Sequence, residues 1–165
     1  MVTIEDLGRI NLLKDVRPQA LERIAGFSQL RTYSPGERIL SAADSAFERD
    51  LYLLLNGEVS VVKIVLPPLQ VGQVDIDAIQ SQVYGEIGWL MDRSPTAELF
   101  SKSNTVFIQV NGRRLKQLCA QDTHTGHLIM MRLAILLARR TDNLTELMAV
   151  TEIAKQQRDN MKDFI

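Results

Sequence analysis

The stretch YGEIGWLMDRSPTAEL, residues Tyr84 to Leu99, decides how this sequence is interpreted. Two glycines, Gly85 and Gly88, flank a carboxylate, Glu86, and open a short helical turn. Glycines allow a close approach of the backbone, and the N–H groups at the start of a helical turn point toward an anion. The stretch therefore predicts an anion-binding bend in which Glu86 accepts a hydrogen bond from a hydroxyl group. Taken alone, so short a motif also fits a tight turn with a surface acid.

The composition is that of an ordinary globular chain. With 165 residues the protein is long enough for one hydrophobic core but short for two, so we expect a single domain. Hydrophobic residues make up 45% and charged residues 24%, which excludes a disordered or fibrous class. The formal net charge of -1 argues against a general nucleic-acid binder, because such proteins carry a basic surplus.

Location is also predicted from composition. The longest apolar runs, such as Leu51 to Leu55 and Leu133 to Ala138, are far shorter than the roughly 20 residues that a membrane-spanning helix needs. We therefore expect no membrane association, and the acidic N-terminus does not resemble a signal peptide. Cys119 is the only cysteine, so an internal disulfide is impossible and a reducing cytoplasm is predicted. We interpret Cys119 as a small packed thiol rather than a nucleophile.

The middle of the chain, residues 31–110, has the pattern of short strands. In DLYLLLNGEVSVVKIV the Asn56-Gly57 pair separates two apolar runs, which is the strongest short hairpin signal. Leu51–Leu55 and Val59–Val65 are therefore predicted to be antiparallel neighbours, with Pro67-Pro68 ending the second run. A Pro-Gly turn in RTYSPGERIL and alternation in NTVFIQVN add further strands, so we expect a closed or double-sheet β architecture.

Both ends of the chain are predicted to be helical. Residues 1–30 show helical spacing at Ile10, Leu13 and Val16, and Pro18 suits the first turn of a second helix. Residues 111–121 form a short helix, and from His127 onward the chain contains neither Gly nor Pro. A continuous helix to residue 160 is about 50 Å long.

The long final helix is the basis of our partner prediction. Its first half is apolar nearly all round, which predicts burial on more than one side. Its second half keeps an apolar stripe at 3,4 spacing, and this stripe predicts a homodimer through the helix. The alternative is a helix that folds back on its own β domain. The residues of the stripe are Leu144, Leu147, Ala154 and Met161.

The order of these signals resembles the cyclic-nucleotide-binding domain of the cAMP receptor proteins, protein kinase A regulatory subunits and nucleotide-gated channels. The resemblance covers roughly residues 10–145 through LKDV, RPQALERIA, YSPGERIL, DLYLLLNGEVSVV, YGEIGWL, SPTAEL, TVFIQVNGRRL and RLAILLARRT. It implies one domain with N-terminal helices (1–30), an eight-stranded β-roll (31–110) and C-terminal helices (111–165). It also implies that residues 84–97 form a phosphate-binding cassette whose ligand contacts are Gly85, Glu86, Ile87, Gly88, Thr96 and Ala97.

Thr96 departs from the pattern of the resembled family. There the cassette ends in Pro-Arg-Ala-Ala or Arg-Ser-Ala, and the arginine clamps the cyclic phosphate. The SPTAEL turn places Thr96 at that position, where it offers one neutral hydrogen bond instead of a charged fork. We expect affinity for cAMP or cGMP to be lower by roughly one to three orders of magnitude. Arg93, in the same turn, is a candidate replacement, whereas Glu98 adds a further negative charge.

The resemblance also predicts contacts from the long helix, because in the family this helix caps the base. The segment RRTDNLT offers Arg140, Asn143, Leu144 and Thr145. Asn143 and Thr145 are predicted to hydrogen-bond a purine edge and Leu144 to act as an apolar lid. The alternative is a solvated face combined with a dimer seam.

Two functions remain open on the sequence. The first is a cytoplasmic sensor module that binds a cyclic nucleotide or other small anion and signals through its last helix to an unknown protein. The second is an interaction module whose pocket no longer binds nucleotide because Thr96 replaces the arginine. We expect no enzyme, cofactor or metal, since His124 and His127 are the only histidines and no nucleophile–base pair is visible. About twenty residues follow Thr145, so we expect no helix-turn-helix domain and no DNA recognition by that route.

Overall fold

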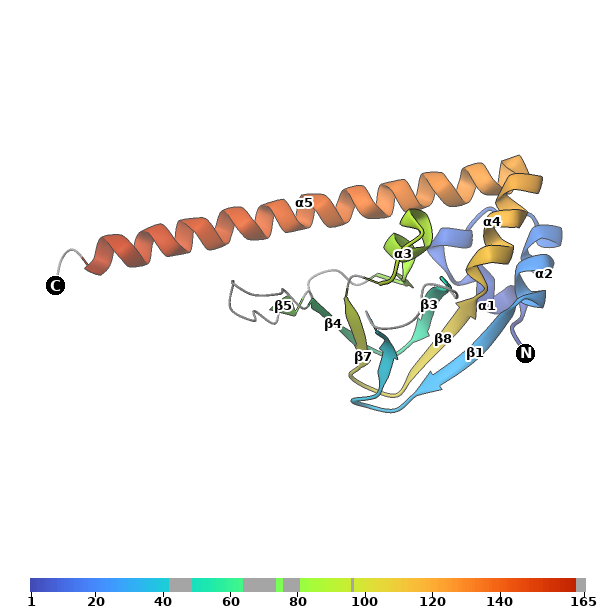
Figure 1. Ribbon diagram of the computed structural model, residues 1–165, viewed down its shortest axis with the longest axis horizontal. Helices are drawn as coiled ribbons and strands as arrows, with labels where there is room; N and C mark the ends of the chain where they lie inside the picture. Colours follow the sequence, from blue (N-terminus) through green and yellow to red (C-terminus); the bar gives the residue numbers. More distant parts are fainter. Residues whose placement is uncertain (42–48, 64–73, 76–80, 96, 163–165) are drawn as a thin grey trace.

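The computed structural model describes residues 1–41, 49–63, 74–75, 81–95 and 97–162, with the backbone alone at 63, 74–75, 144 and 147–162. Helices cover one side of a β-roll, and one long helix runs across the top of the molecule (Figure 1). The expected architecture, mainly β with flanking helices, is confirmed. In the described part of the chain no helix is both long and apolar enough to cross a membrane.

The N-terminal region contains α1 (Ile4–Gly8), the 3-10 turn η1 (Asn11–Leu13) and α2 (Pro18–Gly26). Pro18 occupies the first turn of α2, as predicted. The spacing of Ile10, Leu13 and Val16 belongs to a 3-10 turn rather than to an α-helix, although all three side chains are buried. An α-helix cannot continue through this segment because Asp15, two residues after η1, has a left-handed backbone (φ 62).

The strands form two four-stranded antiparallel sheets, in the orders β1-β8-β3-β6 and β2-β7-β4-β5. The described residues contain eight strands, but β5 and β6 are two-residue pairings, so the roll has fewer extended strands than the eight expected from the resemblance. The bounds are β1 Ser28–Tyr33, β2 Arg38–Leu40, β3 Leu51–Asn56, β4 Val59–Lys63, β5 Val74–Asp75, β6 Val83–Tyr84, β7 Glu98–Ser101 and β8 Thr105–Val110.

The hairpin predicted at Asn56-Gly57 is wrong, because β3 and β4 belong to different sheets. Strand β3 pairs with β6 and β8, whereas β4 pairs with β5 and β7. The turn between them bonds to the β7–β8 turn instead: the Glu58 N–H donates to Ser103 Oγ (3.0 Å), and Glu58 O accepts from the Lys102 N–H (2.8 Å). An irregularity in β3 between Leu54 and Asn56 redirects the strand, so the chain crosses from one sheet to the other.

The C-terminal region consists of α4 (Gly112–Gln121) and α5 (Thr123–Lys162). Helix α5 is continuous as predicted, begins slightly before His127, and with 40 residues is about 60 Å long. The prediction of burial on more than one side is wrong. Ile129 and Leu133 are buried, but Met131 and Ile135 on another face are 49% and 48% exposed. A helix that rests on the domain along one line leaves its other faces uncovered.

Two hydrophobic clusters hold these layers together. The larger one joins the helices to one face of the β1-β8-β3-β6 sheet and includes the fully buried Trp89. The smaller one lies on the other face, where Phe107 is surrounded edge-on by Tyr33, Tyr52 and Tyr84 at ring-centroid distances of 6.0 to 6.4 Å. The sheet is therefore buried on both faces near β3.

Candidate functional site

The cassette begins with a backbone bend that only glycine accommodates well. Strand β6 ends at Tyr84, Gly85 follows with φ +81, and α3 (Glu86–Met91) starts at once. A Cβ on Gly85 would lie 2.7 Å from the carbonyl oxygen of Asp50, so an L side chain is excluded by both conformation and space. The bend predicted from the sequence is present, and it places Glu86 directly after the turn.

The second glycine, Gly88, is required because the chain passes close to it again at Arg93. Gly88 is buried, and a Cβ there would lie 2.9 Å from the carbonyl oxygen of Arg93. The Arg93 N–H donates to Gly88 O (3.2 Å), whereas the Arg93 side chain is exposed. Arg93 therefore closes the turn through its backbone.

Glu86 is a buried carboxylate with an internal partner. It is only 3% exposed, so the alternative of a turn with a surface acid is wrong. Arg140, which comes from α5, donates through Nη1 to Glu86 Oε1 and through Nη2 to the Val83 carbonyl (2.7 Å). The guanidinium also lies over the Tyr84 ring, 5.9 Å from its centroid. The long helix thus contacts the cassette through one arginine.

The electrostatics of this pair are dominated by burial. Loss of solvent raises the pKa of Glu86 above its ordinary value, and the nearby Arg140 charge only partly opposes the rise. The charge of Arg140 and its hydrogen bond to Oε1 offset part of the cost of burying the carboxylate. Any group that takes Arg140 away from Glu86 must replace this stabilisation.

The remaining predicted site residues differ in burial and in whether the structure describes them. Ile87 and Ala97 are half-buried in the cassette, and Thr96 lies outside the described residues. Asn143 and Thr145 are exposed on α5, where Thr145 Oγ1 donates to the Thr141 carbonyl (2.9 Å), and the side chain of Leu144 is outside the described residues. Of the predicted α5 contacts with described side chains, only Arg140 reaches the cassette.

Sequence reasoning missed the pairing of Arg140 with Glu86. The Arg139-Arg140 pair reads as a polar stripe on a helix, and spacing alone does not reveal which arginine turns inward. The only signal was the position of a charged pair beside an apolar helical stretch. In the structure Arg139 is exposed and Arg140 is half-buried.

Helix α3 is also attached to α4. The Trp89 indole Nε1 donates to the Gly112 carbonyl (2.8 Å), and Lys116 lies 5.8 Å from the centre of the Trp89 ring. At the end of α3, Asp92 accepts from Lys116 Nζ (2.6 Å) and from Arg49 Nη1 (2.7 Å). These two cations lower the pKa of the Asp92 carboxyl, Lys116 having the larger effect. The cassette helix is therefore connected to both C-terminal helices.

Metal ligands are not clustered in the described ranges. There, no three His, Cys, Asp or Glu side chains lie close enough to share an ion, and His124 and His127 are exposed on the first turns of α5.

Comparison with known proteins identifies the fold. No protein-family model matches the chain, and no curated protein matches its sequence significantly. A putative cyclic nucleotide-binding protein from Geobacter metallireducens is 19% identical and superimposes with a TM-score of 0.66, over 86% of this chain and 99% of that one. The regulatory subunit of a cAMP-independent protein kinase A from Trypanosoma brucei is also 19% identical, with a TM-score of 0.63 over 79% of this chain and 44% of that one.

A third structure is the sensor domain of the transcriptional regulator DNR from Pseudomonas aeruginosa, which is 16% identical with a TM-score of 0.64 over 84% of this chain and 90% of that one. The chain has the fold of cyclic-nucleotide-binding domains, so the resemblance seen in the sequence is confirmed at the level of fold. Since one of these structures comes from a transcriptional regulator, the likeness gives no support to the expected absence of DNA recognition.

Proposed function

We propose that this chain is a non-enzymatic regulatory module of the cyclic-nucleotide-binding type, in which a small anion binds in the 84–97 cassette and changes the position of α5. One observation carries the proposal: the Arg140 guanidinium of α5 lies inside the cassette, on Glu86 and the Val83 carbonyl. A ligand that contacts either member of the pair acts directly on the helix.

Arg140 supplies the positive charge that Thr96 does not. An anion that accepts hydrogen bonds from Arg140 competes with Glu86 for the same guanidinium, so its binding favours a different arrangement of α5. Such a ligand shifts the population only by its difference in affinity for the two arrangements. The proposed contacts are Gly85, Glu86, Ile87, Gly88, Thr96 and Ala97 from the cassette and Arg140, Asn143, Leu144 and Thr145 from α5.

Titration calorimetry with cAMP and cGMP tests this function. We expect weak binding by the wild type and a gain of at least about tenfold in T96R, because a charged fork replaces a neutral hydroxyl. R140M should lose binding, whereas R140K, the matched control, should retain part of it since the charge remains. The single tryptophan, Trp89, lies in α3 and reports each titration by its fluorescence.

The absence of binding heat in both the wild type and T96R would contradict a sensor of cyclic nucleotides. A gain in affinity in R140M would contradict the role of Arg140 as counter-charge, because Arg140 would then act as a competitor of the ligand.

A second function is favoured by the same ion pair. Glu86 is already engaged by Arg140, which leaves less of its hydrogen-bonding capacity for a sugar hydroxyl. A module of this kind keeps α5 docked without nucleotide and acts as a protein-interaction domain. One structural neighbour, the regulatory subunit from Trypanosoma brucei, belongs to a cAMP-independent protein kinase A, which supports this second function. Negative titrations, with α5 docking still dependent on Arg140, would select this function.

The partner surface in either case is the uncovered face of α5. Met131, Ala134, Ile135 and Ala138 are exposed at i, i+3, i+4 and i+7 spacing, which is the pattern of a helix that packs on another helix. The same face on a second copy is the occupant that we infer, giving a homodimer. The side chains of the stripe that the sequence predicted for this seam lie outside the described residues: Leu144, Leu147, Ala154 and Met161. A cytoplasmic location and the absence of DNA recognition stay predictions from the sequence.

A further inference from the structure

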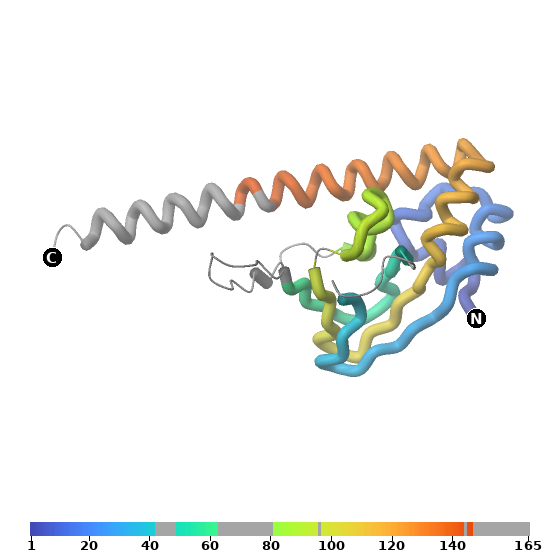
Figure 2. The backbone as a smooth tube through the Cα atoms, viewed as in Figure 1, coloured from blue at the N-terminus to red at the C-terminus, as the bar shows by residue number. Residues whose placement is uncertain are grey.

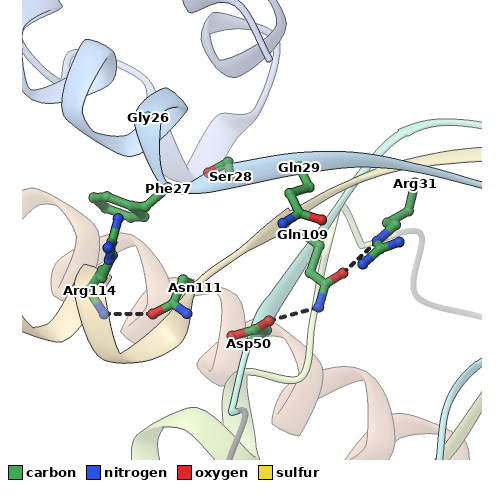
Figure 3. Close-up of a pocket in the computed structure, with 9 residues that line it drawn as sticks. All are labelled: Gly26, Phe27, Ser28, Gln29, Arg31, Asp50, Gln109, Asn111 and Arg114. Atoms are coloured by element: carbon green, nitrogen blue, oxygen red, sulfur yellow. Dashed lines mark hydrogen bonds between the residues drawn. The ribbon is translucent and has the colours of Figure 1, made fainter. Parts of the chain in front are cut away.

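A polar pocket lies at one end of the β1-β8-β3-β6 sheet, where α2 leads into β1 and β8 leads into α4. Its volume is about 430 Å³, within the range of sites that bind small molecules. Figure 3 shows the side chains that surround it. The pocket shares no lining residue with the cassette. It is lined by Gly26, Phe27, Ser28, Gln29, Arg31, Asp50, Gln109, Asn111 and Arg114.

Strand register explains how the central side chains gather. Gln29 is paired with Gln109, and Gln109 is also paired with Tyr52 on the other side. Directly paired residues of antiparallel strands project to the same face, and so do residues two apart along a strand. Gln29, Arg31 and Gln109 therefore share the sheet face that carries Phe107, and the polar pocket continues that face beyond the aromatic cluster.

The one acid of the pocket lining is already engaged by the protein. Asp50 Oδ1 accepts from the Gly112 N–H (3.0 Å), and Oδ2 accepts from Gln109 Nε2 (2.7 Å). Gln109 Oε1 in turn accepts from Arg31 Nε (2.9 Å), which completes a chain of three side chains (Figure 3). The chain orients Arg31 through Nε and leaves its terminal nitrogens for other contacts.

Arg114 stands at the opposite end of the pocket, and its side chain extends toward Phe27 (Figure 3). Its backbone N–H donates to Asn111 Oδ1 (3.0 Å), so the start of α4 is capped internally. Among the described residues, neither Arg31 nor Arg114 forms an ion pair with a carboxylate. The pocket thus combines two guanidinium groups and side-chain amides with one carboxylate, Asp50, whose hydrogen bonds come from neutral donors, so its lining carries a net charge of +1.

We propose that this pocket is a second ligand site, separate from the cassette, for a small organic polyanion that carries carboxylates or phosphates. Arg31 and Arg114 hold its two charged ends, because planar guanidinium groups match carboxylate and phosphate oxygens. Gln29 and Asn111 supply neutral hydrogen bonds between them. The site is open to solvent and polar, so binding weakens as salt is added.

The test is titration of the full chain with citrate, a tricarboxylate, and with inorganic phosphate, followed by amide NMR signals. Citrate should shift the signals of residues 26–31 and 109–114 in a saturable way, and R31A and R114A should each weaken its binding about tenfold or more. R113A is the matched control, because Arg113 is an exposed neighbour of Arg114 that does not line the pocket. A stronger response to citrate than to phosphate assigns carboxylates, and the reverse assigns phosphates.

Three results would overturn the second site: signal changes that never saturate with either probe, an equal loss in R113A, or a loss in only one of the two pocket variants. R31K and R114K are the controls for misfolding. They keep the positive charge and nearly the same side-chain length, but they cannot make the bidentate contact of a guanidinium group. If the alanine variants lose citrate binding while the lysine variants bind as the wild type does, positive charge alone explains the binding. The proposed bidentate contacts of the two guanidinium groups are then wrong. R140M should leave citrate binding unchanged, which separates this site from the cassette.

Discussion

Glu86 and Arg140 form the residue-scale feature on which the cassette depends. The carboxylate side chain is 4% exposed and the guanidinium 19%, so both charges are largely removed from water. Removing one partner of such a pair leaves the other charge buried without compensation, whereas replacing both by neutral groups is far less costly. The pair therefore contributes more to the position of α5 than to net stability.

At this scale we predict that R140M lowers the free energy of unfolding by about 3 kcal/mol at pH 7.5. Without Arg140 the pKa of Glu86, already raised by burial, rises further. The folded state then binds a proton more tightly than the unfolded state, so stability increases as the pH falls through the range between the raised folded pKa and the ordinary value. Urea unfolding followed by Trp89 fluorescence, at pH 7.5 and pH 5, measures the recovery.

The double variant E86Q/R140M is the control for this prediction. With the buried charge removed, it should recover most of the lost stability and lose the pH dependence of R140M. Equal stability of the single and double variants at pH 7.5 would mean that the pair is not the reason for the loss.

At the scale of elements, the start of α4 is the junction between the cassette helix and the sheet. Gly112 accepts from the Trp89 indole through its carbonyl and donates to Asp50 through its N–H. A Cβ on Gly112 would lie 1.7 Å from the carbonyl oxygen of Arg49, which is backbone and cannot move aside cheaply. Gly112, at the start of α4, therefore contacts both α3 and the two residues that precede β3, Arg49 and Asp50.

We predict that G112A lowers the unfolding free energy by about 2 kcal/mol or more, because overpacking against backbone forces the junction apart. Urea unfolding measures the loss, and a red shift of Trp89 emission in the folded state reports the displaced indole. G8A is the matched control, since a Cβ there meets nothing within 4 Å, and it should leave stability unchanged or slightly raised. A G112A protein as stable as G8A would contradict this account of the junction.

At the scale of the whole molecule, the long helix extends well beyond the domain on which it rests (Figure 1), and its N-terminal half runs along that domain (Figure 2). Its buried side, with Ile129 and Leu133, belongs to the large core, while Met131 and Ile135 remain exposed. Exposed apolar side chains arranged along one face of a helix indicate a surface that another element covers.

We predict a dimer in solution, with a mass of about twice 18.6 kDa by light scattering after size-exclusion chromatography. M131E/I135E should shift the protein toward the monomer, because two buried charges at the helix seam repel each other across the symmetric interface. I4E is the control: Ile4 is also an exposed apolar residue, at 38%, but lies on α1. A wild-type monomer, or a double variant that remains dimeric, would contradict the proposed seam.

The sequence by itself determined the kinds of elements and their order. Pro18 marked the start of α2, the absence of Gly and Pro after His127 predicted the continuous helix, and the Gly85-Glu86 motif predicted the bend between β6 and α3. These signals are local, since each depends on backbone conformation or on spacing within one segment. The expected cyclic-nucleotide-binding fold followed from their order.

Tertiary structure alone decided which segments meet. The Asn56-Gly57 turn joins two sheets rather than two paired strands, because the partner of β3 is chosen by packing and not by the turn. Arg140 finds Glu86 across 54 positions of sequence, and Arg31 connects through Gln109 to Asp50 in the same way. Side-chain pairing over such separations depends on the rotation of each helix or strand about its own axis and on the position in which it packs. No local sequence pattern encodes either of these.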